Sequence, residues 1–136
     1  MIDSTVNNQS AELLFQMYLF GRKIKSNLKQ HNKDMMLKMA ILKILSDHQS
    51  MTVSQISNKI HAGLSATSER LRNLKEKQLI TNVQCQDGRE NQYKITDNGK
   101  KLLSNHIQHT CKKNILDKLS TQELQQLMHI VHKLST

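Results

Sequence analysis

Apolar residues recur at helical spacing near the start of the chain. They form a stripe at i, i+3, i+4 and i+7 that consists of Leu13, Leu14, Met17, Phe20, Ile24 and Leu28. This spacing predicts an amphipathic helix from Ala11 to Leu28, capped by Ser10 and preceded by a frayed leader, Met1 to Ser10. Phe15, Tyr18 and Leu19 widen the stripe, so we expect contacts on two sides of this helix.

The next segment, Met35 to Leu45, is apolar except for Lys38 and Lys43. A helix that is apolar nearly all round is buried, so this pattern predicts the central helix of the core.

Residues 51–99 change pattern several times within a short length. Val53, Ile56 and Ile60 have helical spacing, Ala62 and Gly63 break it, and a second helix is expected from Leu64 to Lys77. Leu64, Thr67, Leu71 and Leu74 share the face of this helix that should pack inward. Two short helices joined by a glycine-containing turn predict a helix-turn-helix.

A β-hairpin is predicted directly after the second helix. Residues 79–83 and 91–96 alternate like strands, and the turn between them is expected at residues 86–90, which include Arg89. A helix-turn-helix followed by a hairpin that carries arginine is a winged helix, a fold that can place its second helix in a DNA major groove.

The remaining residues predict two more helices. One is expected from Asn98 to Leu119, after a cap at Thr96 or Asp97, although polar residues 109–114 interrupt its apolar stripe. The last opens with Ser120-x-x-Glu123, a capping box, and presents Leu124, Leu127, Met128, Val131 and Leu134 on one face. The expected fold is therefore mainly α with a small β-hairpin wing.

The order of these residues resembles the MarR family of bacterial winged-helix transcription regulators. The resemblance rests on residues 64–71 and 74–80, and on Asp87-Gly88-Arg89 followed by Ile95-Thr96-Asp97-Asn98-Gly99. The family's wing pattern is Asp-x-Arg, a few strand residues, then Leu-Thr-x-x-Gly. This chain departs from it at Ile95, where leucine is usual, and at Gln78, where glycine is usual.

The resemblance implies one MarR-type domain over residues 1–136, with the DNA-binding part at 51–99. It also implies a homodimer formed by the helices in 10–33 and 100–136, whose apolar faces the DNA-binding part is too small to cover. Such a dimer would repress transcription from a pseudo-palindromic operator. A small lipophilic or aromatic effector would bind where the first, second and fifth helices meet, and Met17, Met35, Met36 and Met39 could line an adaptable cavity there. The alternative for these methionines is ordinary core packing.

The outer face of the second helix supplies the candidate DNA contacts, which are Ser65, Ala66, Ser68, Glu69, Arg70, Arg72, Asn73 and Lys77. Small residues near its N-terminus permit close approach, and Ala66 could touch a thymine methyl group. Glu69 stands where the family often has a basic residue. Its carboxylate could accept from cytosine, hold Arg70 or Arg72, or lie free on the surface.

Arg89 at the wing tip suits the narrow, electronegative minor groove, and Asp87 could brace its guanidinium group. The alternative is a solvated hairpin tip.

The net positive charge of the chain favours a polyanionic partner. Twenty Lys and Arg against eleven Asp and Glu give a net charge of +9 over 136 residues. Residues 22–33 are densely basic and form either a solvated face or a surface that assists the approach of DNA. No apolar run is long enough to cross a bilayer and no signal peptide is recognised, so a cytoplasmic protein is expected.

Other chemistries have weaker support. His106 and His109, like His129 and His132, have the i, i+3 spacing of metal ligands on a helix, which leaves a zinc-sensing regulator as an alternative. An architectural DNA-binding protein without an effector is another. Cys85 and Cys111 form no metal or disulfide motif and read as inert small apolar residues. No phosphate loop, nucleophile elbow or carboxylate pair indicates an enzyme, and no cofactor is expected.

Overall fold

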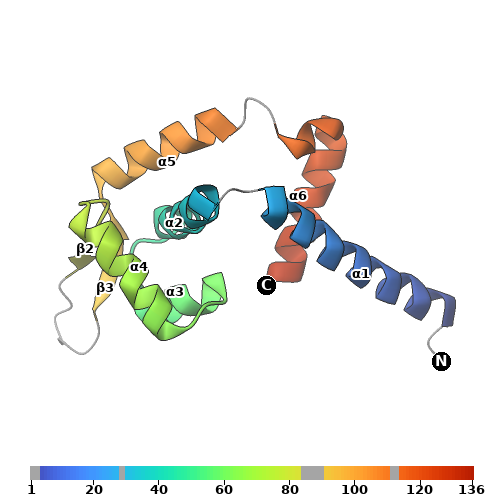
Figure 1. The fold of residues 1–136 in the computed structure, drawn as a ribbon, viewed down its shortest axis with the longest axis horizontal. Coiled ribbons are helices and arrows are strands. Elements are labelled where there is room, and N and C mark those ends of the chain that lie inside the picture. Colours follow the sequence, from blue (N-terminus) through green and yellow to red (C-terminus); the bar gives the residue numbers. More distant parts are fainter. Residues whose placement is uncertain (1–3, 28–29, 84–90, 111–113) are drawn as a thin grey trace.

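The computed structural model describes residues 4–27, 30–83, 91–110 and 114–136. The chain is mainly helical with one small antiparallel sheet (Figure 1). In order, its elements are α1 (Ser4–Asn27), α2 (Gln30–Asp47), β1 (Met51–Thr52), α3 (Val53–Ile60), α4 (Leu64–Glu76), β2 (Ile80–Val83), β3 (Gln92–Ile95), α5 (Asp97–Thr110), a 3-10 helix (Ile115–Lys118) and α6 (Thr121–Ser135). The predicted fold class is confirmed.

The core lies around α2, as its apolar pattern predicts. Met39, Ile41, Leu42 and Leu45 are buried, and α2 packs against α3, α5 and β3. Ile56 of α3, Leu71 and Leu74 of α4, and Ile80 of β2 complete the apolar cluster. This cluster holds the two helices of the helix-turn-helix against the sheet.

The sheet has one strand more than the sequence predicts. β3 lies between β1 and β2, and Met51 pairs with Tyr93 while Ile80 pairs with Ile95. Two residues are too short a run to show alternation, so β1 leaves no periodic signal.

The first and the fifth helix differ from their predicted boundaries. α1 begins at Ser4, so Ser10 is an internal helical residue and not a cap. No proline or glycine interrupts residues 4–20, so the helix can extend toward the N-terminus.

The predicted fifth helix ends at Thr110, well before Leu119. Asn114 is extended, its Oδ1 accepts the N–H of Leu116 at 2.8 Å, and Asp117 accepts the N–H of Asn114 at 3.0 Å. These side chains compete with the helical backbone and start a separate 3-10 turn.

The last helix begins as predicted. The Ser120 hydroxyl accepts the N–H of Glu123 at 3.1 Å, and the Glu123 carboxylate accepts the N–H of Ser120 at 3.0 Å. These bonds from Ser120, the backbone one above all, lower the pKa of the Glu123 carboxyl from its usual range. The predicted capping box is confirmed.

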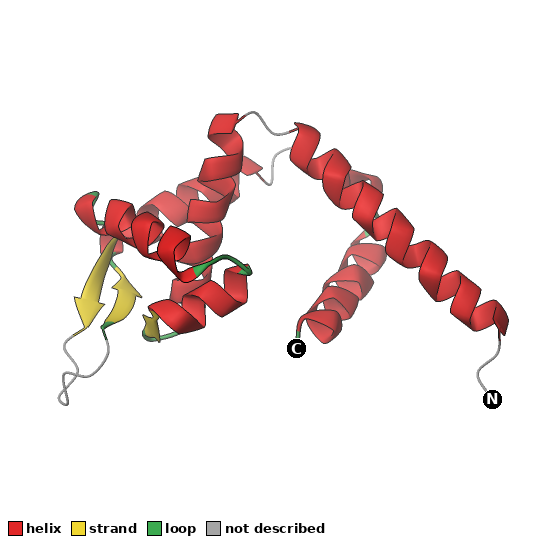
Figure 2. Ribbon diagram, turned by 60° about the horizontal axis from the view of Figure 1, so that its bottom comes forward, coloured by secondary structure: helices red, strands yellow, loops and turns green. Residues whose placement is uncertain are grey.

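α1 and α6 lie on the same side of the molecule, apart from the part built by α2 to α5 and the sheet (Figure 2). Every side chain described in α1 is exposed, including Leu14, Phe15 and Leu19, and the apolar side chains Met128, Val131 and Leu134 of α6 are exposed as well. The single chain therefore leaves two apolar helices without a covering surface. Within the described residues, none of the helices is long and apolar enough to cross a membrane.

Candidate nucleic-acid interface

The turn between α3 and α4 fixes how α4 projects from the core. His61 ends α3 in the left-handed region at φ 54°, and Gly63 precedes α4 with an ordinary φ of −69°. The left-handed position that the turn requires is thus filled by His61, while the glycine that marks the turn in the sequence does not need its conformational freedom.

The inward face of α4 anchors it. Thr67, Leu71 and Leu74 are buried, and the Thr67 hydroxyl donates to the carbonyl of Gly63 at 2.8 Å. Leu64 was expected on this face, but its side chain is 56% exposed, so that prediction is wrong. Leu64 is the first residue of α4 and lies one turn before the packed positions begin.

The outward face of α4 carries most of the candidate contacts. Ser65, Ala66, Ser68, Glu69, Arg72 and Lys77 are exposed, whereas Arg70 and Asn73 are half-buried. Within the described chain, neither an ion pair nor a hydrogen bond engages Glu69, so the structure does not show it holding Arg70 or Arg72. The Nε atom of Arg70 is buried without a hydrogen-bond partner in that same part of the chain.

Two open hollows lie along this face. Leu64, Ser65, Ser68, Glu69 and Arg72 line one of about 650 Å³. The other, of about 380 Å³, lies where the start of α3 meets α4 and β3, and its lining is Thr52, Val53, Ser54, Ser68, Asn91 and Tyr93. Ser68 borders both hollows, so the outer face of α4 continues toward the wing.

Sequence reasoning missed the polar residues of the second hollow. Thr52 caps α3 by accepting the N–H of Gln55 at 3.2 Å, and Gln55 accepts the N–H of Thr52 at 2.9 Å. The Thr52-x-x-Gln55 capping box is visible in the sequence and could have located this helix start. The approach of Asn91 and Tyr93 could not have been found that way, because it depends on the sheet.

The base of the wing is fixed by the Thr96-x-x-Gly99 part of the predicted motif. The Thr96 hydroxyl accepts the N–H of Gly99 at 3.1 Å and so caps α5. Gly99 is buried, and a Cβ atom there would collide with the carbonyl oxygen of Leu79. Gln78 has a φ of 61°, which explains why glycine is usual at this position of the motif.

The other candidate residues are those of the wing tip, the two cysteines and the methionines of the predicted effector pocket. Asp87, Arg89, Cys85 and Cys111 lie outside the described residues. Met39 is in the core and Met35 packs against it, but Met17 and Met36 are exposed.

His106 is half-buried and His109 exposed on α5. In the part of the chain that the structure describes, no three His, Cys, Asp or Glu side chains gather as metal ligands.

Solved structures share this fold. BldR, a transcriptional regulator from Sulfolobus solfataricus, is similar with a TM-score of 0.71 and 19% identity, over 90% of this chain and 94% of that one. A MarR family transcriptional regulator from Silicibacter pomeroyi is similar with a TM-score of 0.70 and 20% identity, over 90% of this chain and 86% of that one. A MarR family protein from Bacillus stearothermophilus is similar with a TM-score of 0.61 and 18% identity, over 98% of this chain and 96% of that one. The predicted resemblance is confirmed as a shared fold.

A family model described as replication-relaxation matches residues 42–133, which is more than half of the chain. The match runs from the buried part of α2 into α6 and includes the whole winged-helix part. No curated protein matches the chain.

Proposed function

This chain belongs to the replication-relaxation family and has the MarR winged-helix fold, and on that premise we propose that it is a sequence-specific, DNA-binding transcription regulator. One observation carries the proposal above the others. α4 is locked by buried Thr67, Leu71 and Leu74, and it turns a continuous polar face outward. A rigid helix with one free polar face suits insertion into a major groove.

The chemistry of α4 suits the reading of base edges at its N-terminal half. Ser65, Ala66 and Ser68 are small and exposed, so the helix axis can come close to the bases. Exposed Leu64 beside them offers an apolar contact to a thymine methyl group, and free Glu69 can accept from cytosine N4. Arg72, Asn73 and Lys77 lie further along and would meet outer base edges or phosphates, while Arg70 lies on the flank.

The hollow between α3, α4 and β3 would hold the sugar-phosphate backbone. The hydroxyl of Ser54 and the phenol of Tyr93 line it beside the N-terminus of α3, where backbone N–H groups favour an anion. Arg89, at the tip predicted for the wing and braced by Asp87, would enter the neighbouring minor groove.

A second copy of the chain would cover the apolar faces of α1 and α6. Exposed apolar surface of this extent marks an interaction site, and both helices lie on the same side of the molecule (Figure 2). A two-fold dimer presents two α4 helices to successive major grooves about one helical turn apart, and therefore binds a pseudo-palindromic duplex. Repression follows where this operator overlaps a promoter, and such a regulator acts in the cytoplasm.

The effector predicted from sequence is a small lipophilic or aromatic molecule bound near the junction of the first, second and fifth helices, although α1 extends away from α2 and α5 in the single chain (Figure 2). Met17 and Met36 are exposed and Met35 is half-buried, so their flexible side chains are available to repack around a ligand. Such a ligand acts by preferring one spacing of the two DNA-binding parts.

Selection of bound sequences from a random DNA pool tests the proposal. The expected result is an enriched palindrome, bound more tightly than random duplex, with an affinity that falls steeply as salt rises. Lys75→Ala should reduce the salt slope by about one unit if Lys75 meets a phosphate. Equal affinity for all sequences would instead indicate an architectural protein, and an affinity that does not change with salt would contradict DNA binding by this basic chain.

The family description favours one second candidate, a regulator whose DNA target lies in a replication control region. The same winged-helix domain could bind DNA beside a promoter or DNA in a replication control region. Mapping bound sites on the DNA of the source cell separates them, because sites beside promoters support transcription control and sites confined to replication origins support the second candidate.

A further inference from the structure

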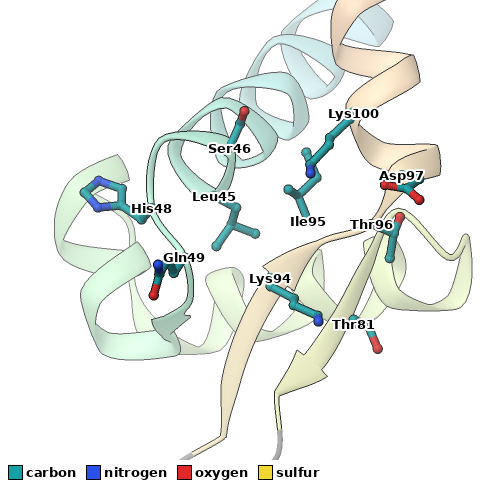
Figure 3. A pocket seen from close by; sticks show the side chains of 10 residues that line it. All are labelled: Leu45, Ser46, His48, Gln49, Thr81, Lys94, Ile95, Thr96, Asp97 and Lys100. Carbon is teal, nitrogen blue, oxygen red and sulfur yellow. The ribbon is translucent and has the colours of Figure 1, made fainter.

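A hollow on another part of the molecule has no role in the proposed DNA contact. It has a volume of about 430 Å³, is open to solvent, and is bordered by the C-terminal end of α2, by β2 and β3, and by the start of α5 (Figure 3). Its lining is Leu45, Ser46, His48, Gln49, Thr81, Lys94, Ile95, Thr96, Asp97 and Lys100. The volume lies within the ~300–1,000 Å³ range of small-molecule sites.

Basic side chains from separate elements line this hollow (Figure 3). Lys94 comes from β3 and Lys100 from the first turn of α5, and His48 lies beyond the end of α2. Within the described residues, neither lysine forms an ion pair or a side-chain hydrogen bond. Uncompensated positive charges that share one concavity favour the binding of an anion.

The one carboxylate at the rim does not neutralise them. Asp97 lies three residues before Lys100 on the same helix, yet no ion pair joins the two. Figure 3 shows Lys100 beside Ile95, and Asp97 at the start of α5 on the edge of the hollow.

Neutral donors complete the lining. Thr81 pairs with Lys94 across the β2–β3 ladder, which places both side chains on the same face of the sheet. Ser46 at the end of α2 and Gln49 just beyond it line the hollow, and neither their side chains nor that of Thr81 form a hydrogen bond within the described chain. The Thr96 hydroxyl is already engaged by Gln78 and Gly99. Leu45 and Ile95 add apolar surface.

We infer that this hollow binds a phosphorylated small molecule, held by Lys94, Lys100 and the neighbouring hydroxyl and amide groups. A phosphate group offers several acceptor oxygens and about two negative charges, which matches two ammonium groups better than a singly charged carboxylate does. The volume exceeds that of a phosphate ion alone, so the ligand carries further atoms.

A ligand in the hollow would affect DNA binding. This consequence rests on the proposed function. The ligand would join β3, which leads from the wing, to α5, and none of the hollow's residues is on α4. It would therefore act on the position of the wing without displacing DNA from α4.

The test measures binding to the full chain in the absence of DNA, by calorimetry with inorganic pyrophosphate and with ribose 5-phosphate. Saturable binding of one equivalent per chain is expected, and unphosphorylated ribose should not bind. Lys94→Ala and Lys100→Gln should each weaken binding by about tenfold or more, the effect of losing one charge-assisted hydrogen bond. Absence of saturable binding by both probes would overturn the inference.

Two controls separate the hollow from general positive charge. Lys101→Ala removes the same charge from the exposed residue next to Lys100, and Arg72→Ala removes a cation from the outer face of α4. Both variants should bind pyrophosphate as the unaltered chain does. If either loses as much affinity as Lys100→Gln, binding is diffuse or occurs at the DNA surface, and the inference fails.

A further experiment, with duplex DNA, tests whether the hollow binds a free small molecule or the phosphates of the DNA backbone. If the hollow holds a small molecule, Lys94→Ala with Lys100→Gln leaves the salt slope of duplex binding unchanged in ligand-free buffer. A slope reduced by about two units, together with unaltered pyrophosphate binding, would show that the lysines meet DNA phosphates and would overturn the inference. Because the calorimetry uses no DNA, it stands even if the proposed function fails.

Discussion

The hydroxyl of Thr96 donates a 2.7 Å hydrogen bond to the backbone carbonyl of Gln78. This bond links the start of α5 to the second residue after α4, eighteen positions earlier. The backbone N–H of Thr96 also donates to the carbonyl of Leu79 at 3.1 Å. Thr96 thus links the end of α4, β3 and α5, and so fixes the base of the β2–β3 hairpin relative to α4.

Thr96→Val should destabilise the fold. The change keeps the shape of the side chain but removes both the bond to Gln78 and the cap on Gly99, so we expect a loss of about 1–3 kcal/mol in the free energy of unfolding. Urea denaturation followed by circular dichroism measures it. Thr81→Val is the control, because Thr81 has no side-chain hydrogen bond in the described chain, and it should change stability by about 0.5 kcal/mol or less. Equal losses would contradict the linking role.

Gly99→Ala should destabilise although alanine favours helices. The new Cβ would lie 2.7 Å from Cγ1 of Ile95 and would strike the carbonyl of Leu79, so the backbone must shift at a cost of about 1–3 kcal/mol. Gly21→Ala in α1 is the matched control, since nothing lies within 4 Å of its Cβ position. That change should leave stability unchanged or raise it by up to about 1 kcal/mol in thermal or urea unfolding.

Gln78→Gly should stabilise the protein by up to about 1 kcal/mol. The left-handed backbone at φ 61° costs a side chain about 1–2 kcal/mol, and glycine removes that cost while adding some unfolded-state entropy. Gln78→Val should destabilise, because a branched side chain fits this conformation poorly. Lys77→Gly, at an ordinary φ of −83°, relieves no strain and should not stabilise; a gain there equal to that of Gln78→Gly would refute the explanation.

Leu127→Glu combined with Val131→Glu should dissociate the proposed dimer. Both residues lie on the apolar face of α6, and a buried charge without a partner opposes association. Light scattering at micromolar concentration should give a dimer mass for the unaltered chain and a monomer mass for the variant, with weaker DNA binding as a consequence. Gln125→Glu adds one such charge to the other side of α6 and should leave the mass unchanged. A monomeric unaltered chain would remove the hypothesis.

Arg89→Ala should weaken operator binding by about 1–3 kcal/mol, the range for a directed contact. Arg89→Lys should restore only part of this, since an ammonium group is more strongly hydrated and lacks the planar fork. Fluorescence anisotropy with operator and random duplexes measures the effect. Lys23→Ala removes one charge from α1 as the control. Small, equal losses for Arg89→Ala and Lys23→Ala on both duplexes would show that the wing makes no specific contact.

Features of the fold that depend on local sequence spacing were predictable. The buried positions of α2 and α4, the Ser120–Glu123 capping box and the two wing strands follow from spacing, because neighbours along the chain decide them. The starts and ends of helices were less predictable. α1 extends to Ser4 because nothing in its sequence stops it, and α5 ends early because Asn114 bonds to its own neighbours.

The sequence by itself determined the order of the helices and strands, the winged-helix pattern and the polar residues of α4, since these depend on contacts within a few residues. Only the tertiary structure decided that Leu64 is exposed, that β1 joins the sheet, and that Lys94 and Lys100 share one hollow with Thr81. Each of these depends on residues brought together from distant parts of the chain. Their distances in space are set by packing around α2, which no local pattern records.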